Sequence, residues 1–194
     1  MQQERKERDE QITKFIRRRK QEIFGPRFID ASLAKIDFPD WAQDRLAEFM
    51  EKKKNFLVFC GSPGYGKTYL CAALLDWCME TFESFRYWNE GNLLQRIRDG
   101  MQNDKGDYLK NLKFLIDDPF VMLDDVGSQG VNEWRAEIIF DAIDNRYNSM
   151  LPTVITSNFT RKEFEQQYHP RLISRLFARE NTIIEIHDGL DKRK

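Results

Sequence analysis

Short apolar runs alternate with amphipathic stretches along most of the chain. From Asn55 onward, five apolar runs of four or five residues predict buried strands, and the stretches between them carry apolar residues at helical spacing. The expected strands are residues 56–60, 85–88, 120–123, 153–156 and 182–186. Helices are expected near residues 68–81, 91–101, 132–149, 161–168 and 170–178. This alternation is typical of an α/β fold, a parallel sheet covered by helices on both faces.

The N-terminal part has a different pattern. Residues 3–22 are highly charged and carry only a thin apolar stripe at helical spacing, which predicts a helix that ends at Gly25 and Pro26. The basic run RRRK at 17–20 is most simply a solvated helix face, and binding to DNA or to a partner is the sharper interpretation. The stripe consists of Ile12, Phe15, Ile16 and Ile23.

A second helix is expected before the alternating region. Asp40 and Gln43 have the spacing of a capping box, which predicts a helix from there to about Lys53. Thr160 with Glu163 predicts another capping box at the start of a later helix. The buried face of the earlier helix is expected to contain Ala42, Leu46, Phe49 and Met50.

The most informative motif lies between the first strand and the helix that follows it. Residues 61–68 read GSPGYGKT, which fits G-x-x-x-x-G-K-[ST], and the strand–loop–helix context makes a chance glycine-rich turn a poor alternative. Such a loop turns backbone N–H groups toward phosphate oxygens at a helix N-terminus. Lys67 is expected to reach the β- and γ-phosphates and Thr68 to bind Mg²⁺. The expected nucleotide-binding residues are Gly61, Ser62, Pro63, Gly64, Tyr65, Gly66, Lys67, Thr68 and Tyr69.

Two carboxylates directly follow the expected strand at 120–123. Because an ionised carboxylate is costly to bury without a partner, Asp124 and Asp125 form a poor core pattern. Ligands of parallel sheets bind at the carboxyl ends of the strands, where the glycine-rich loop also lies. We therefore expect Asp124 to hold Mg²⁺ through water and Asp125 to orient and polarise the attacking water, with a plain solvated strand end as the alternative. The similar pair at 117–118 is expected to lie in a polar loop.

Two further groups are candidates for the same chemistry. Asn158 follows the fourth strand, where a neutral amide can sense the γ-phosphate or the attacking water, although Asn is also common in ordinary loops. Arg171 and Arg175 lie one helical turn apart on a short helix. Exposed arginines are the simplest interpretation, but phosphoryl transfer needs an added cation, which a neighbouring subunit can supply as an arginine finger.

Composition limits the class of protein. A chain of 194 residues suits one domain with a short appendage, and a net charge of −1 means that any nucleic-acid contact depends on local patches. Cys60, Cys71 and Cys78 lie in apolar contexts without metal-ligand spacing, which indicates core residues in a reducing compartment. With no signal peptide and no apolar run long enough to span a bilayer, we expect a cytoplasmic protein that does not bind membranes.

Four motifs in this order resemble those of the AAA+ ATPases: Walker A (GSPGYGKT), Walker B (FVMLDD), sensor 1 (ITSN) and an arginine-finger helix (LISRL). More narrowly, the chain resembles the helicase-loader and transposition-helper branch, the DnaC/DnaI/IstB type. The narrower resemblance depends on VMLDDVG, DAIDNRY (141–147), LPTVITSNF (151–159), RLISRL and ASLAKIDF (31–38). It covers about residues 28–194 as an ATPase domain, which leaves residues 1–27 as a charged N-terminal helix and linker.

The resemblance implies an AAA+ P-loop NTPase core, a five-stranded parallel sheet in the order 5-1-4-3-2 between helices. Since the chain stops soon after its fifth strand, the C-terminal helical lid and its sensor 2 arginine are expected to be missing, with Arg193 as a partial substitute. Many relatives carry Glu in place of Asp125, so the shorter side chain implies slow hydrolysis. The implied site comprises Lys67 and Thr68 for phosphate and Mg²⁺, the metal carboxylate Asp124, the catalytic residue Asp125, sensor 1 Asn158 and the finger Arg175.

Initiators and loaders carry an extra helical element after the second strand that lines a channel for single-stranded DNA. Residues 90–113 occupy that place here, and cations with an aromatic residue suit a single strand. An amphipathic helix with a polar loop, packed on the sheet, is the equally weighted alternative. The candidate DNA contacts are Arg96, Arg98, Lys105, Tyr108, Lys110 and Lys113.

Together, the motifs favour an ATP- and Mg²⁺-dependent ATPase that loads a hexameric replicative helicase onto single-stranded DNA. By resemblance it would self-associate through a composite ATP site, hydrolyse ATP slowly with stimulation by DNA, and dock its helicase on the helix around 12–23. One alternative is an IstB-like transposition helper that binds duplex DNA and a transposase. Another is a small P-loop kinase, which would give Asn158 and Arg175 no role.

Overall fold

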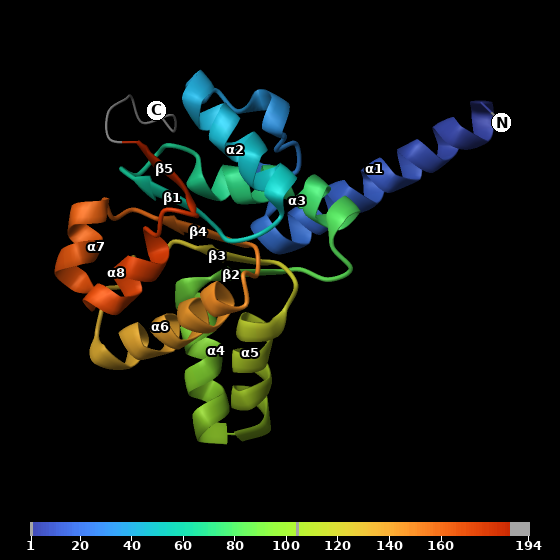
Figure 1. Ribbon diagram of the computed structural model, residues 1–194. Helices are drawn as coiled ribbons and strands as arrows, with labels where there is room; N and C mark the ends of the chain where they lie inside the picture. Colours follow the sequence, from blue (N-terminus) through green and yellow to red (C-terminus); the bar gives the residue numbers. More distant parts are fainter. Residues whose placement is uncertain (1, 104, 187–194) are drawn as a thin grey trace.

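The computed structural model describes residues 2–103 and 105–186. Its five strands form one parallel sheet in the order β2-β3-β4-β1-β5, which is the expected order 5-1-4-3-2 counted from the other edge (Figure 1). The predicted strands are confirmed, each within one residue of its expected ends. The strands are β1 (Phe56–Gly61), β2 (Arg86–Asn89), β3 (Val121–Asp124), β4 (Thr153–Ser157) and β5 (Thr182–Ile186).

Helices connect the strands and cover both faces of the sheet. Across the described ranges, no helix combines the length and the apolar character that crossing a membrane requires. The α-helices are α1 (Gln2–Phe24), α2 (Asp40–Lys52), α3 (Lys67–Thr81), α4 (Glu90–Asn103), α5 (Lys105–Asp117), α6 (Glu133–Asn148), α7 (Arg161–Gln167) and α8 (Pro170–Leu176). Two short 3₁₀ turns are η1 (Pro26–Phe28) and η2 (Leu33–Lys35).

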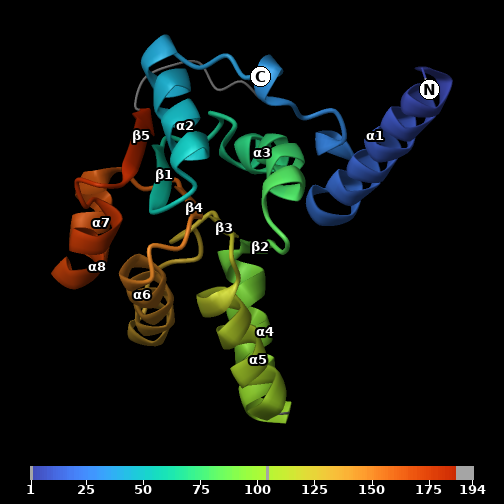
Figure 2. The same cartoon turned by 45° about the vertical axis from the view of Figure 1, so that its right-hand side comes forward.

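The central strand β1 shows why the sheet has two cores. Phe56, Val58 and Cys60 face one side, where they pack with residues of α4 to α8. Leu57 and Phe59 face the other side and pack with α2 and α3. All five side chains are at most 1% exposed, and burial on both faces explains why this strand is a continuous apolar run in the sequence. Figure 2 shows the two helical layers on either side of the sheet.

The apolar pattern predicts no helix over residues 105–117, although the resemblance implies an extra helical element over residues 90–113. Residues 105–117 form α5, which lies beside α4 and projects with it from the β2 edge of the sheet (Figures 1 and 2). The expectation of a polar loop at 117–118 is wrong for Asp117, which ends α5, and confirmed for Asp118, which lies in the bend before β3. The Asp118 carboxylate lies 2.5 Å from Nε of Arg86. This ion pair joins the end of α5 to the start of β2.

The start of α2 also differs from the expectation. Pro39 is the N-cap, and Asp40 is the first helical residue rather than the capping one. Gln43 donates instead to the Phe38 carbonyl at 2.9 Å, so the expected capping box at Asp40 is wrong. Proline already holds an extended backbone at the cap, and Asp40 gains from the positive end of the helix dipole. The other predicted capping box, Thr160 with Glu163, is confirmed with both of its hydrogen bonds.

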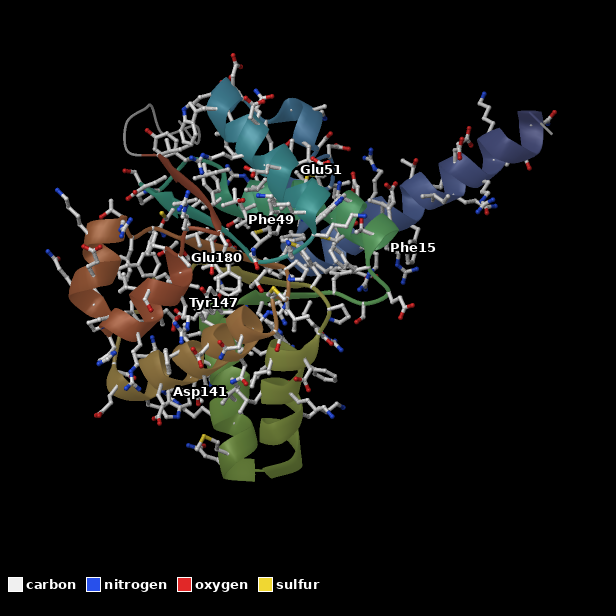
Figure 3. All side chains as sticks on the ribbon, viewed as in Figure 1. Phe15, Phe49, Glu51, Asp141, Tyr147 and Glu180 are labelled. Atoms are coloured by element: carbon white, nitrogen blue, oxygen red, sulfur yellow. The ribbon has the colours of Figure 1, made fainter. Side chains whose placement is uncertain are left out.

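The helix α1 is attached to the body at its C-terminal end, and its N-terminal part projects (Figures 1 and 2). Lys20 is 3% exposed, lies 2.6 Å from the Asp76 carboxylate on α3 and donates to the Ala31 carbonyl at 2.7 Å. The basic run at 17–20 is thus not a wholly solvated face, because its last residue is buried. Phe15, labelled in Figure 3, is 55% exposed on the projecting part. The division at residue 27 stays a prediction.

Candidate nucleotide-binding site

The carboxyl ends of neighbouring strands bring the predicted polar residues to one edge of the sheet. Cys60 of β1 pairs with Ser157 of β4, and Leu123 of β3 pairs with Ile155, so the loops after these strands begin side by side. A cavity of about 880 Å³ opens at this edge. Its walls are residues 63–69 of the glycine-rich loop and the start of α3, residues at the ends of β3 and β4 and directly after them, and part of the segment 27–38.

Two glycines give the phosphate loop its shape. Gly61 has φ 123°, and a Cβ there would lie 1.9 Å from the Ile186 carbonyl oxygen, so the close approach of β5 requires glycine. Gly66 has φ 77° and caps α3. The chain thereby turns sharply from β1 into the N-terminus of α3, whose free N–H groups suit an anion. Of the nine predicted nucleotide-binding residues, the seven from Pro63 to Tyr69 line the cavity, and Gly61 and Ser62 do not.

Lys67 is the buried cation of the loop. It is the first residue of α3, is 8% exposed, and its Nζ donates to the carbonyls of Gly61 at 2.9 Å and Ser62 at 2.7 Å. An ammonium group carries three protons, so it can exchange or add phosphate oxygens as acceptors without leaving the loop. The residues therefore fit a polyphosphate in the cavity.

Asp124 is surrounded by hydroxyl donors. The residue is 2% exposed, and its Oδ2 accepts from Thr68 Oγ1 at 2.9 Å and from the Tyr87 hydroxyl at 2.8 Å. Its Oδ1 accepts from the Thr156 hydroxyl. Because Thr68 donates its proton to the carboxylate, the lone pairs of its oxygen remain for a cation. This pairing fits the predicted Mg²⁺ role of both residues.

Mg²⁺ is usually held by one or two carboxylates together with waters and substrate phosphates. Within the described ranges, no group of three or more His, Cys, Asp or Glu side chains is arranged to hold a metal on its own. The cysteines Cys60, Cys71 and Cys78 are buried and form no disulfide, and burial raises the pKa of the Cys60 thiol to about 12. The donor set at Asp124 and Thr68, one carboxylate and one hydroxyl, suits a magnesium nucleotide.

Asp125 and Asn158 meet at the wall of the cavity. Asp125 leaves β3 in the left-handed region with φ 65°, and its N–H donates to Thr156 Oγ1 at 3.0 Å. Asn158 Nδ2 donates to Asp125 Oδ1 at 2.8 Å. The structure thus brings together the two residues that the sequence analysis placed near the γ-phosphate. Their roles in hydrolysis stay predictions.

Sequence reasoning missed a buried glutamate that supports the loop after Asp125. Glu90 opens α4, is 1% exposed, and accepts from the Gly127 N–H at 3.0 Å. Burial raises the pKa of Glu90, while the Gly127 hydrogen bond and the charge of Arg135 act in the opposite direction. An acidic residue in the first turn of a helix is ordinary in sequence, so only its neighbourhood shows its role. Tyr87 and Thr156 were also missed, because only their contacts with Asp124 on a neighbouring strand show their roles.

Arg175 lies outside the cavity wall. Its Nε is 2.8 Å from Asp144 Oδ1 on α6, and its guanidinium stands 5.0 Å from the centre of the Tyr147 ring. The Tyr147 hydroxyl in turn donates to the Glu180 carboxylate, and both residues are labelled in Figure 3. We refer to the surface of Asp144, Tyr147, Arg175 and Glu180 as the α6–α8 face. An arginine-finger role requires a second subunit and stays a prediction.

The candidate DNA contacts lie on the projecting pair of helices α4 and α5. The guanidinium of Arg96 stands 5.5 Å from the Trp88 ring, and that of Arg98 stands 5.1 Å from the Trp134 ring. Lys110 lies 5.8 Å from the Phe114 ring, and Lys113 is exposed. The side chains of Lys105 and Tyr108 lie outside the described residues, as does Arg193. DNA binding by this set stays a prediction.

Several curated relatives are named for DNA replication or transposition. The replicative helicase loader DnaI of Bacillus subtilis is 26% identical over 117 residues, which cover 60% of this chain and 37% of the relative. The loader DnaC of Escherichia coli is 24% identical over 135 residues, 70% of this chain and 55% of the relative. A putative ATP-binding protein of insertion sequence IS232 from Bacillus thuringiensis is 24% identical over 132 residues, 68% and 51%. The chain thus spans between about a third and just over half of these relatives.

Solved structures agree with the sheet order and the helical layers. A crystal structure of DnaI superposes with a TM-score of 0.68 at 25% identity, covering 90% of this chain and 100% of that one. The DnaC helicase loader gives 0.67 at 25% identity, covering 82% and 99%. The initiator DnaA bound to AMPPCP and single-stranded DNA gives 0.70 at 19% identity, covering 87% and 52%, which shows a shared fold alone. The fold is that of the AAA+ ATPases.

The family comparison covers most of the chain. Residues 9–179 match the family described as IstB-like ATP binding protein. That span contains the glycine-rich loop, both carboxylates after β3, Asn158 and Arg175. The chain therefore belongs to the IstB-like ATP-binding proteins.

Proposed function

We propose that this protein is an ATP-dependent loader that engages a hexameric replicative helicase and single-stranded DNA in the cytoplasm. The observation that carries the proposal is the division of the site. The phosphate and metal side is assembled within one chain around the cavity, whereas Arg175 lies on the α6–α8 face, outside the cavity wall. A site divided in this way suits an ATPase that acts between subunits. The similarity to the loaders DnaI and DnaC supports the choice of partner.

The arrangement of residues around the cavity supports the following proposal for hydrolysis. When bound with ATP, Mg²⁺ neutralises phosphate charge. Thr68 would bind the ion and Asp124 would hold it through water, while the Lys67 ammonium bonds the phosphates. The amide of Asn158 orients Asp125 through the 2.8 Å bond. Asp125 would then take a proton from the attacking water as the water oxygen bonds the γ-phosphorus, the bond from this phosphorus to the β–γ bridging oxygen breaks, and ADP leaves. The short Asp125 side chain keeps this step slow.

Nucleotide state would control assembly. Arg175 of one subunit would leave Asp144 and bind the γ-phosphate of the ATP held by a neighbouring subunit. ATP would thereby join the subunits, and its hydrolysis would release the subunits from one another and from the helicase. The projecting part of α1, with Ile12 45% and Phe15 55% exposed, would dock the helicase. The cations of α4 and α5 would contact single-stranded DNA and stimulate hydrolysis.

The test is a loading assay with the replicative helicase of the same host and circular single-stranded DNA. We expect a complex of protein and helicase, and delivery of the helicase onto the circle, with ATP but not without nucleotide. Lys67→Ala should fail in delivery while keeping its fold. Failure of the protein to form a complex with the helicase, both with and without ATP, would contradict the proposal.

The family and the relative from insertion sequence IS232 support a second candidate, a transposition helper. This protein would bind duplex DNA and a transposase, with the same ATP site. Competition between duplex and single strands of equal length separates the two functions. Preference for duplex, together with binding to a transposase and not to a helicase, would establish the helper.

A further inference from the structure

The hydroxyl of Tyr87 bonds the carboxylate that we assign to the metal. Tyr87 lies inside β2, and its hydroxyl is 2.8 Å from Asp124 Oδ2, the same oxygen that accepts from Thr68. Asp124 therefore has two donors on Oδ2, one from the phosphate-loop helix and one from β2, and a third, Thr156 of β4, on Oδ1. Together with Thr156, the Tyr87 hydroxyl restricts rotation of the carboxylate and so sets the direction in which it faces the cavity.

The ring of Tyr87 is held by the last residue of α1. Phe24 packs on it with ring centres 4.3 Å apart, inclined by 57°. Phe24 also meets Phe28 edge-on, with ring centres 6.3 Å apart, and Phe28 lines the cavity. Phe24 thus stands between the cavity wall and the tyrosine that bonds Asp124. Both contacts are aromatic pairs, which favour particular inclinations over sliding.

The end of α1 is fixed to the body one turn before Phe24. Lys20 is buried, lies 2.6 Å from Asp76 of α3, and bonds the Ala31 carbonyl at 2.7 Å. The earlier part of α1 projects away, with Phe15 exposed (Figures 1 and 3). Because a helix is stiff over such a length, a force or a partner on the projecting part acts at Lys20 and Phe24.

We propose that Tyr87 is a positioning residue for Asp124 and that Phe24 couples it to α1, so that α1 and the metal side of the nucleotide site influence each other. The proposal rests on the proposed function in one respect, since it requires nucleotide and Mg²⁺ in the cavity. Binding linkage is reciprocal: whatever α1 does to metal-assisted nucleotide binding, the magnesium nucleotide does to α1 to the same extent. A partner docked on α1 would then be released or held according to the nucleotide state.

The first test measures the gain in affinity for a fluorescent ATP analogue when Mg²⁺ replaces EDTA. We expect Tyr87→Phe, which keeps the ring and removes the hydroxyl, to reduce this gain roughly 3- to 10-fold, the size that one hydrogen bond supports. Its affinity in EDTA should equal that of the wild type. Tyr147→Phe is the matched control, because it removes a hydroxyl that also bonds a carboxylate, that of Glu180, and neither residue lines the cavity.

A double-mutant cycle tests the coupling. Phe24→Leu should reduce the gain from Mg²⁺ several-fold, and adding it to Tyr87→Phe should reduce the gain no further. An additive double variant, or a full gain in Tyr87→Phe, overturns the coupling. If the wild type binds no nucleotide in either condition, the proposed function fails together with the coupling. If the wild type binds nucleotide but Tyr87→Phe keeps the full gain from Mg²⁺, only the coupling fails, so the two failures are distinguishable. Thermal unfolding of each variant identifies any that fail to fold. If Phe24→Leu does not fold, Tyr87→Phe alone still tests the positioning role of Tyr87.

Hydrogen exchange supplies the reciprocal measurement. We expect the magnesium nucleotide to slow amide exchange in residues 17–24 of the wild type several-fold more than nucleotide in EDTA does. In Tyr87→Phe the additional protection from Mg²⁺ should disappear, and Tyr147→Phe should behave like the wild type. Equal protection of these residues in Tyr87→Phe and wild type would overturn the role of Tyr87.

Discussion

The cavity edge and the α6–α8 face use charged groups in different ways. At the cavity edge, Lys67, Asp124 and Asp125 bond to neighbours that are themselves fixed by the strand ends, and all three line a space of about 880 Å³. On the α6–α8 face, Arg175 bonds Asp144 and stacks on Tyr147, outside that space. The first set is organised to receive a ligand, and the second is a charge held by a partner of its own chain.

Two arginines near this face show how such a partner can be exchanged. Arg146 is 1% exposed and donates to Thr153 Oγ1 and to carbonyls in the last turn of α5, directly after α5 and directly before β4. Burial lowers its pKa to about 10. Releasing it would leave several buried acceptors unpaired. The Arg175–Asp144 pair has side chains that are 36% and 28% exposed, and such a pair contributes at most about 1 kcal/mol. Arg175 can therefore leave its partner at small cost.

The largest expected effect follows from removing the arginine of the α6–α8 face. Arg175→Ala should reduce DNA-stimulated ATP turnover of the assembled protein about 10³-fold or more, as loss of an arginine finger does, while the isolated protein binds the ATP analogue normally. Phosphate release over a series of protein concentrations measures the first quantity, and equilibrium titration measures the second. The reason is that the cation acts on the site of a neighbour.

Arg171→Ala is the matched control, since Arg171 is exposed one turn away on the same helix. It should retain most of the turnover. A mixture of Arg175→Ala with Lys67→Ala should regain part of the activity, because one variant supplies an intact site and the other an intact arginine. Full turnover by a dilute, monomeric Arg175→Ala protein would contradict the finger role.

The cavity edge was predictable because its signals are local in sequence. The loop at 61–68, Asp124 with Asp125, and Asn158 each directly follow an apolar strand, and parallel strands gather their carboxyl ends. Tyr87 lies inside β2 and carries no such signal, and Glu90, although it directly follows β2, also opens α4, where an acidic residue is ordinary. Their partners belong to β3 and the loop after it, more than 30 residues away in sequence. Their roles depend on β2 lying beside β3.

The predicted ends of helices were wrong where contacts outside the local sequence pattern decided where a helix begins. Pro39 took the capping position that Asp40 was expected to fill. The helix α5 was missed because its N-terminal turn is polar and glycine-containing, whereas Leu115 near its end is buried against the sheet. The partner of Arg175 could not be predicted either, because Asp144 lies in a different helix, 31 residues before it. Tertiary contacts decided each of these points.

The second expected effect breaks the cavity edge. Lys67→Ala should weaken binding of the ATP analogue about 100-fold, because it removes hydrogen bonds from a charged donor to phosphate. Fluorescence titration of the isolated protein measures this change. Lys162→Ala is the matched control, since Lys162 is exposed on α7 and lies outside the cavity wall. Equal affinity in Lys67→Ala and wild type would remove the assignment of the phosphate loop.

The smallest expected effect is a change in how the free energy of unfolding depends on pH, and it concerns the buried carboxyl group of Glu90 near the cavity edge. Burial raises the pKa of Glu90 above its value in the unfolded chain, so between the two values the folded protein binds more protons at this group. The free energy of unfolding should therefore fall as pH rises through that window and level off above the pKa of the folded state. Glu90→Gln should flatten this part of the profile, measured by urea unfolding from acid to neutral pH. Glu51→Gln, an exposed acid on α2 labelled in Figure 3, should leave it unchanged. An unaltered slope in Glu90→Gln would mean that the Gly127 hydrogen bond and Arg135 fully compensate the burial of this carboxylate.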